Sequence, residues 1–171
     1  MTELLRSMKR PLGMGCALAL ATLLTPTARA GESDHGEAIT KWLGSYDVAL
    51  NAKDLDRLAS FYHPEVTIFE GGSTNDGWAD YRDNHLGPEL EEFQSLQFSH
   101  FNVKTHPLSQ DDRAAYVTAE YRLKAQVKDR EVDAAGLETL VLVRDDKGAW
   151  KIRHSHTSSR RRPAASPTPQ K

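Results

Sequence analysis

Two histidines near the end of the chain offer the clearest chemistry in the sequence. His154 and His156 fall in the stretch WKIRHSHTSS, residues 150–159. At the strand period of two they share a face with Trp150 and Ile152, whose apolar side chains predict that this face points inward. Imidazoles that point into an interior need polar partners. The spacing therefore predicts a polar pocket with both histidines in its wall.

A metal ion is one partner that would suit these histidines. Histidines at positions i and i+2 of one strand face, with carboxylates nearby, are typical ligands of zinc or copper. Two alternatives stay open: the histidines hydrogen-bond to tyrosine, glutamate or backbone groups and hold the shape of the pocket, or they act directly in catalysis. The candidate ligands for zinc or copper are His154, His156, Glu70, His85 and His100.

The first thirty residues predict export. A positively charged start precedes a short apolar run, 12–24, and the small residues of 28–30 offer a cleavage site. The apolar run is too short to span a membrane. The leucine that a lipoprotein signal needs three residues before its cysteine is missing before Cys16. We expect cleavage after Ala30 and a periplasmic or secreted product without a stable membrane anchor.

Composition narrows the function further. The chain of 171 residues has a formal net charge of −2, and the predicted signal removes more basic than acidic residues. The remaining acidic chain is not expected to bind nucleic acid. Cys16 is the only cysteine and lies in the predicted signal. The exported part is therefore expected to contain neither a disulfide nor a thiol nucleophile.

The order of apolar patterns predicts helices first. A flexible lead-in, 31–37, precedes a helix over 38–52, where apolar residues recur at helical spacing. A second, short helix follows Asp54. A third is expected to begin near residue 76 and to break at Gly87-Pro88. Pro88 is expected to start a further helical turn that reaches Phe93.

Strands dominate the rest of the chain, which makes the predicted fold class α+β. A short strand over 66–70 precedes the third helix. Short polar links join the later strands, which indicates antiparallel hairpins. Residues 160–171 are basic and then rich in proline and alanine, which predicts a disordered tail. The four long strands are expected over 94–106, 113–127, 131–144 and 150–159.

Two sequence phrases and this order of elements resemble the NTF2-like (SnoaL-like) superfamily. Residues 45–73, SYDVALNAKDLDRLASFYHPEVTIFEGGS, are similar to the opening of the bacterial ketosteroid isomerases. Residues 148–159, GAWKIRHSHTSS, resemble the last strand of SnoaL-like and DUF4440-type proteins. The resemblance implies a domain over 38–159, with three helices packed on a curved antiparallel sheet as a cone with an internal pocket. Because the superfamily hosts many unrelated activities, it implies the fold more strongly than a function.

The isomerase resemblance implies catalytic roles for three residues. Tyr46 matches a tyrosine that helps to hold an oxyanion, Glu70 matches the general base, and Glu138 is nearest to a protonated carboxylic acid. Such a set moves a proton from a carbon beside a carbonyl while hydrogen-bond donors stabilise the enolate. Glutamate replaces the aspartate of the isomerases, and two polar histidines in the pocket would disfavour a steroid.

Further residues of the third helix are candidates for ligand binding. Trp78 and Tyr81 are placed to line the mouth of the pocket, and Arg82 to pair with Glu70 or to bind an anion. His85 is a candidate ligand-binding residue on the next turn. The exported iota-class carbonic anhydrases also share the fold and end in a histidine-rich strand that closes with two serines, which implies carbonic anhydrase activity as another alternative.

The strand over 131–144 predicts a partner. Leu137, Val141 and Val143 are apolar on one face, and Leu140 and Leu142 are apolar on the other. One face lines the cone, so the other predicts a homodimer through the convex side of the sheet. Taken together, the sequence predicts an exported protein that binds a small polar ligand or a metal ion. An acid–base enzyme, with Glu70 as base and Tyr46 as donor, is the alternative.

Overall fold

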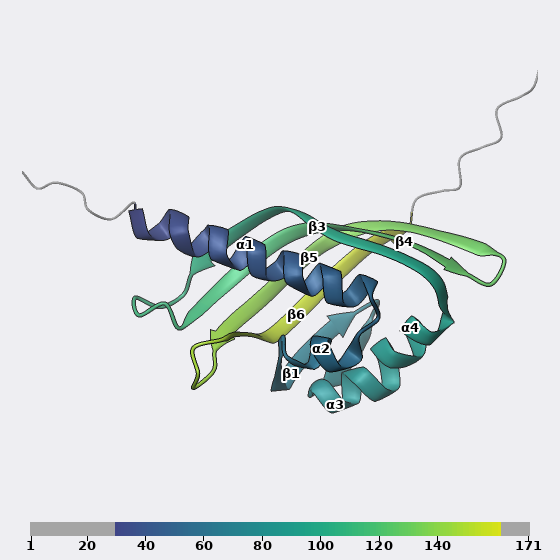
Figure 1. The fold of residues 1–171 in the computed structure, drawn as a ribbon, viewed down its shortest axis with the longest axis horizontal. Helices are drawn as coiled ribbons and strands as arrows, with labels where there is room; N and C mark the ends of the chain where they lie inside the picture. Colours follow the sequence, from purple (N-terminus) through teal and green to yellow (C-terminus); the bar gives the residue numbers. More distant parts are fainter. Residues whose placement is uncertain (1–29, 162–171) are drawn as a thin grey trace, which may run out of the picture.

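The computed structural model describes residues 30–161, and the burial of side chains over residues 35–159. A curved six-stranded sheet carries helices on its concave side (Figure 1). This arrangement confirms the predicted α+β class and the NTF2-like cone. The predicted signal segment up to residue 29, and the predicted tail from residue 162 on, lie outside the described residues.

The first helix, α1 (Ala30–Asn51), lies across the concave face of the sheet. The predicted apolar positions, among them Ile39 and Leu43, are almost completely buried. The helix begins at Ala30, before the predicted start at residue 38, while the flexibility expected for residues 31–37 stays a prediction. His35 Nε2 lies 2.7 Å from Asp112 Oδ2, which fastens the first turns to the loop after β3. No helix within residues 30–161 has the length and hydropathy to cross a membrane.

A short second helix, α2 (Leu55–Ala59), follows as predicted. Asp54 caps it, because its Oδ1 accepts a hydrogen bond of 2.9 Å from the backbone N–H of Arg57. Leu58 is fully buried and joins the core beneath α1.

The further helical turn predicted from Pro88 is confirmed, but the break expected before it is not, because the helical backbone continues through Gly87. This helical stretch consists of α3 (Trp78–Tyr81), a π-helical turn η1 (Arg82–Leu86) and α4 (Gly87–Glu92). The backbone N–H of Gly87 bonds to the carbonyl of Arg82, and a Cβ on Gly87 would lie only 2.5 Å from that oxygen. Glycine therefore permits the wider turn, while Pro88 suits the first turn of α4.

The sheet has the order β2-β1-β6-β5-β4-β3. In this sheet, β1 and β6 pair in parallel, and the other neighbouring strands pair antiparallel. The four long strands begin and end within one or two residues of the prediction, whereas β2 was expected only as a turn. The strands are β1 (Tyr62–Glu70), β2 (Ser73–Asp76), β3 (Phe93–Pro107), β4 (Ala114–Val127), β5 (Arg130–Arg144) and β6 (Trp150–Arg161).

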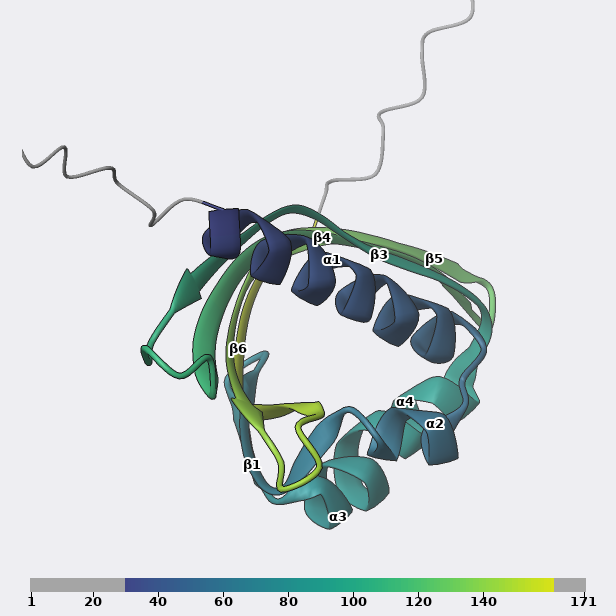
Figure 2. The ribbon, with the colours of Figure 1, turned by 60° about the vertical axis from the view of Figure 1, so that its left-hand side comes forward.

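The sheet curls around the helices, so its concave face and α1 enclose the interior, and α2, α3 and α4 close the end near β1 (Figure 2). Residues from the inward faces of the strands form the core with the apolar stripe of α1. The largest fully buried side chains are Ile39, Leu43, Leu58, Val66, Ile68, Val117, Leu140, Leu142 and Ile152.

A β-bulge in β6 decides which side chains of that strand reach the interior. Leu142 pairs with Ile152 and Val141 with His154, so Arg153 has no partner on β5. The extra residue shifts the alternation by one, so Ile152 and Ser155 are both buried on the concave side. The prediction that His154 and His156 point inward is therefore wrong: His154 lies on the convex face, and His156 is exposed there.

Candidate functional site

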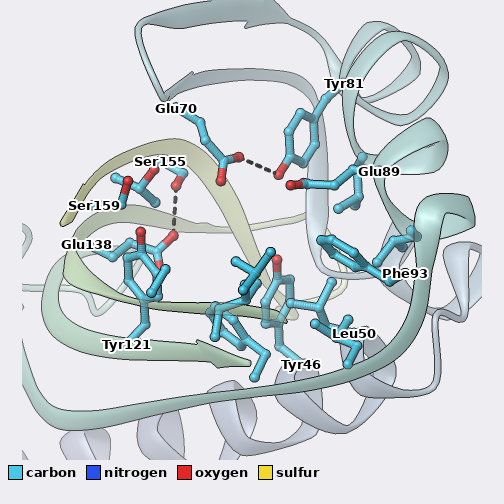
Figure 3. A pocket seen from close by; sticks show the side chains of 18 of the residues that line it. Tyr46, Leu50, Glu70, Tyr81, Glu89, Phe93, Tyr121, Glu138, Ser155 and Ser159 are labelled. Carbon is cyan, nitrogen blue, oxygen red and sulfur yellow. Dashed lines mark hydrogen bonds between the residues drawn. The ribbon is translucent and has the colours of Figure 1, made fainter. Parts of the chain in front are cut away.

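A cavity of about 250 Å³ opens between the concave face of the sheet, α1, and the α3–α4 segment (Figure 3). Three carboxyl groups and four tyrosines share its wall with aliphatic and small hydroxyl side chains. Among the described residues that line the cavity, none has a basic side chain. The polar wall is made by Glu70, Glu89, Glu138, Tyr46, Tyr62, Tyr81, Tyr121, Ser155, Thr157 and Ser159, and the apolar wall by Leu50, Leu86, Leu90, Phe93, Leu96, Phe98, Leu123, Val132 and Ala134.

Glu70 projects into the cavity from the end of β1 (Figure 3). The hydroxyl of Tyr81 donates a hydrogen bond of 2.9 Å to Glu70 Oε2. Burial raises the pKa of Glu70, and the negative charge of Glu138 acts in the same direction; the Tyr81 hydrogen bond and His85 oppose the shift. A carboxyl group with a raised pKa and access to a cavity is suited to accept a proton from a bound ligand and to return it.

A pair of tyrosine hydroxyls lies deeper in the cavity. Tyr46 from α1 and Tyr62 from β1 have their hydroxyl oxygens 2.7 Å apart. Burial is the largest cause that raises the pKa of both residues, and nearby carboxylates add to it. Both phenols therefore stay protonated. One hydroxyl donates to the other, so the pair keeps one hydrogen available to donate to a ligand oxygen.

Glu138 also lines the cavity, and side chains behind it hold both of its carboxylate oxygens. Its Oε2 accepts a hydrogen bond of 2.6 Å from His100 Nε2, and its Oε1 accepts one of 2.8 Å from the hydroxyl of Ser155. His100 Nδ1 donates in turn to Asp47 Oδ1 at 2.6 Å. Since both ring nitrogens of His100 face carboxylates, the ring is held as an imidazolium. We name Asp47, His100 and Glu138 the buried clamp.

The charge of the buried clamp follows from its surroundings. The ring of His100 is only 2 % exposed. Burial alone lowers its pKa, but hydrogen bonds to Asp47 and Glu138 outweigh burial and raise the pKa to about 9. Because both oxygens of Glu138 accept hydrogen bonds, its position favours a carboxylate acceptor over the protonated acid that the isomerase resemblance implies.

The predicted ligand-binding residues of the third helix divide into two groups. Tyr81 lines the cavity. Trp78 stacks on Tyr62, with ring centroids 4.6 Å apart, and Arg82 forms a two-pronged ion pair with its neighbour Asp83. Neither Trp78 nor Arg82 belongs to the cavity wall, so these two predictions find no support in the geometry. His85 lies behind Glu70, with its Nε2 3.9 Å from Glu70 Oε2.

The predicted metal ligands do not converge. His154 Nδ1 lies 2.7 Å from Thr67 Oγ1, and Phe69 places its ring between His154 and His156 on the convex face. His100 belongs to the buried clamp, away from Glu70 and His85. Within residues 30–161 there is no group of three or more histidine, cysteine or acidic side chains arranged to hold a metal ion.

Several residues of the site were not predicted. Tyr62, Asp47 and Glu89 carry no motif that separates them from ordinary helix or strand residues. Ser155 alternates with the two histidines, and the bulge in β6 exchanges the faces of these residues. The alternation that begins at Trp150 and Ile152 assigns the residues after Arg153 to the wrong face of the sheet. Ser155 could therefore have been found only with knowledge of the bulge.

Comparisons with solved structures place the fold among the NTF2-like proteins. An NTF2-like superfamily protein from Salmonella enterica aligns with a TM-score of 0.68 and 18% identity, over 80% of this chain and 98% of that one. A protein named as a candidate ketosteroid isomerase from Shewanella frigidimarina aligns with a TM-score of 0.59 and 22% identity, over 68% and 90%. A hexachlorocyclohexane dehydrochlorinase, LinA-type3, from Novosphingobium barchaimii aligns with a TM-score of 0.62 and 16% identity, over 78% and 90%.

A search of curated proteins gave no match. The model of the SnoaL-like domain family matches residues 38–161, which is most of the chain and contains the whole cavity wall. The solved structures support the same fold at low identity and do not select one activity. The chain belongs to the SnoaL-like domain family of the NTF2-like superfamily.

Proposed function

We propose that this protein is an acid–base enzyme that moves a proton on a small, uncharged organic substrate in the cavity. Glu70 is the base, and the Tyr46–Tyr62 pair donates a hydrogen bond to a substrate oxygen. The observation that carries the proposal is the position of Glu70: a carboxyl group whose pKa is raised by burial, in the wall of a cavity that also presents the two protonated phenols.

The arrangement suits removal of a proton from a carbon beside a carbonyl. The C–H bond breaks, Glu70 takes the proton, and the electron pair moves onto the substrate oxygen as an enolate. A phenol that is held in place before the reaction stabilises this oxygen without reorganisation. The raised pKa of Glu70 makes the carboxylate a stronger base than an exposed glutamate, which favours the transfer.

The charge of the cavity wall supports an uncharged substrate. Glu70, Glu89 and Glu138 all line the cavity, without a basic side chain among the lining residues. Burial is the largest cause that raises the pKa of Glu89, and the charge of Glu70 raises it further. An anionic substrate would add repulsion at short range in a poorly solvated space.

Conjugation of 3-cyclohexen-1-one to 2-cyclohexen-1-one tests the proposal, because it needs one proton removal and one return and changes the ultraviolet absorbance. We expect wild-type protein to catalyse it and Glu70→Gln to lower the rate by about 100-fold or more. Glu65→Gln is the matched control, since the Glu65 side chain lies on the same strand and is 77% exposed.

The result also separates catalysis from simple binding. Binding of cyclohexanone, followed by NMR line broadening, should persist in Glu70→Gln if this residue acts on the proton and not on affinity. Binding without any turnover by wild-type protein would contradict the enzyme proposal for this class of substrate and favour a ligand-binding protein. Carbonic anhydrase activity has less support, because the histidine-rich strand turns His154 and His156 away from the cavity.

We also propose that the protein is exported and acts as a homodimer. Support for the dimer comes from the convex face, where Leu137 is 62% exposed and Phe69 and Phe101 are about 40% exposed. Sedimentation of the chain from residue 31 on should give a dimer, and Leu137→Glu should shift it towards the monomer. Export is tested by mass spectrometry of the protein recovered outside the cytoplasm. We expect the mass of a chain that begins at Gly31.

A further inference from the structure

A chain of polar contacts runs behind Glu70 and is not part of the cavity wall. Asp80 on α3 accepts hydrogen bonds from Asn75 Nδ2 at 3.0 Å, from the backbone N–H of Asp76 at 3.1 Å and from Asn84 Nδ2 at 2.8 Å. Its carboxylate can only accept hydrogen bonds, so the amino group of the Asn75 side chain must face Asp80. Asn75 is 8% exposed and has little freedom to turn.

The orientation of Asn75 fixes the protonation of His85. Asn75 Oδ1 lies 2.9 Å from His85 Nδ1. Since Oδ1 is an acceptor, Nδ1 must carry the hydrogen. A neutral imidazole has one N–H, so Nε2 then carries a lone pair. This is an assignment from the hydrogen-bond network, and it gives His85 one basic nitrogen with a defined direction.

That nitrogen faces Glu70. His85 Nε2 lies 3.9 Å from Glu70 Oε2, and the His85 side chain is 23% exposed, so it lies between the catalytic carboxyl group and solvent. The ring of Tyr81 lies at 5.3 Å from the His85 ring. The charged groups that influence His85 are Glu70 on β1, Asp80 on α3 and Glu89 on α4. Each of these groups is acidic.

We propose that His85 exchanges protons between Glu70 and solvent, and that Asp80 and Asn75 hold it in the tautomer that can do so. The inference rests on the function proposed above. After Glu70 has taken a proton from carbon, its O–H proton passes to His85 Nε2, and the imidazolium releases that proton to water. Glu70 returns to the carboxylate form, and a solvent proton that passes back through His85 to Glu70 is then delivered to the enolate carbon to complete the product. The distance of 3.9 Å closes by a small side-chain movement, as catalytic hydrogen bonds often shorten when substrate binds.

Two readouts test this role, and the first does not need turnover. Nitrogen-15 NMR of histidine-labelled protein distinguishes a protonated from an unprotonated ring nitrogen. We expect neutral His85 to carry its hydrogen on Nδ1 in wild-type protein. Asn75→Ala should shift the population towards the Nε2–H tautomer, whereas Asn84→Ala, which removes a different donor to Asp80, should not. A wild-type His85 with its hydrogen on Nε2 would overturn the inference.

The second readout is the isotope content of the product. During conjugation of 3-cyclohexen-1-one in D₂O, exchange through His85 puts solvent deuterium into 2-cyclohexen-1-one, and direct return leaves the original hydrogen. We expect His85→Gln to lower the ratio of deuterium to retained hydrogen by about threefold or more. Asn84→Ala should keep the wild-type ratio. An unchanged ratio in His85→Gln overturns the role of His85 alone, whereas absence of wild-type turnover overturns the proposed function.

Discussion

Glu70 and Glu138 line the same cavity, but the protein surrounds them differently. Glu70 receives one hydrogen bond, from a neutral tyrosine, and His85 Nε2 lies 3.9 Å from its Oε2. Glu138 accepts hydrogen bonds from the His100 imidazolium and from Ser155, so both of its oxygens are occupied. One glutamate is left basic and accessible, whereas the other is fixed and neutralised.

The difference shows how environment divides the roles of identical side chains. A buried carboxyl group without a cationic partner has a raised pKa and can exchange protons near neutral pH. A carboxylate paired with a buried cation contributes to structure, and it becomes costly when its partner is removed. Glu70 is therefore the cavity residue that carries out the chemistry, and Glu138, through the buried clamp, is the one that stabilises the structure. Each prediction below breaks or sharpens this division.

Loss of the cation in the buried clamp should have the largest effect on stability. His100→Leu leaves Asp47 and Glu138 as buried carboxylates without the imidazolium between them. We expect the free energy of unfolding to fall by about 3–5 kcal/mol, measured by urea denaturation. His106→Leu is the control, because His106 stacks on Tyr116 outside the clamp. A loss below about 1 kcal/mol in His100→Leu would contradict the structural role of the clamp.

The clamp also predicts how stability depends on pH. The pKa of His100 is raised to about 9 in the folded protein, above the ordinary value of 6.5. Folding is therefore stabilised in full below about pH 6.5, and this stabilisation is lost as the pH rises through 9. Its size is on the order of 3 kcal/mol. A proton NMR titration of His100 should give a midpoint near 9; a midpoint near 6.5 would refute the imidazolium assignment.

The charge of a bound ligand tests the electrostatic selectivity of the cavity. Cyclohexanol and cyclohexanecarboxylate have similar size, but only the second is an anion at neutral pH. Because three carboxyl groups line the cavity, we expect the anion to bind about tenfold or more weakly, measured by calorimetry. Glu89→Gln should reduce the difference between the affinities for cyclohexanol and cyclohexanecarboxylate. Equal binding of the two compounds would show that the charge of the cavity wall does not select the ligand.

The convex histidines should have the smallest effect. His154→Ala/His156→Ala removes two rings that contact Phe69 on the far side of the sheet from the cavity. We expect unchanged turnover, the same zinc and copper content as wild-type protein, and a stability change within about 1 kcal/mol. One equivalent of metal that is present in wild-type protein and lost in the double variant would restore the metal-site hypothesis.

Repeating patterns explain which parts of the fold were predictable. The apolar stripe of α1 and the alternation of the long strands each repeat over many residues, so single exceptions do not alter them. The early turns of α1 are accompanied by the His35–Asp112 contact, and the continuous α3–α4 stretch contains the π-turn at Gly87. Both features involve a single local or tertiary contact, which a periodic pattern does not contain.

The candidate site was predictable only in part, for the same reason. Tyr46, Glu70 and Glu138 followed from the family resemblance, and all three line the cavity. The buried clamp joins Asp47 on α1, His100 on β3 and Glu138 on β5, which only the folded chain brings together. In β6 one extra residue places the following side chains on the faces opposite to those predicted. A pattern of alternating residues does not reveal such a bulge.

The most direct test compares Glu70→Gln with Glu138→Gln, two isosteric changes of residues that line the cavity. For each variant, the rate of 3-cyclohexen-1-one conjugation and the melting temperature are measured on the same preparation. We predict that Glu70→Gln loses turnover by about 100-fold or more while its melting temperature stays at or above the wild-type value. Glu138→Gln should lower the melting temperature and retain more turnover than Glu70→Gln. Full turnover in Glu70→Gln, or the opposite pattern in the two variants, would contradict the division of roles between Glu70 and Glu138.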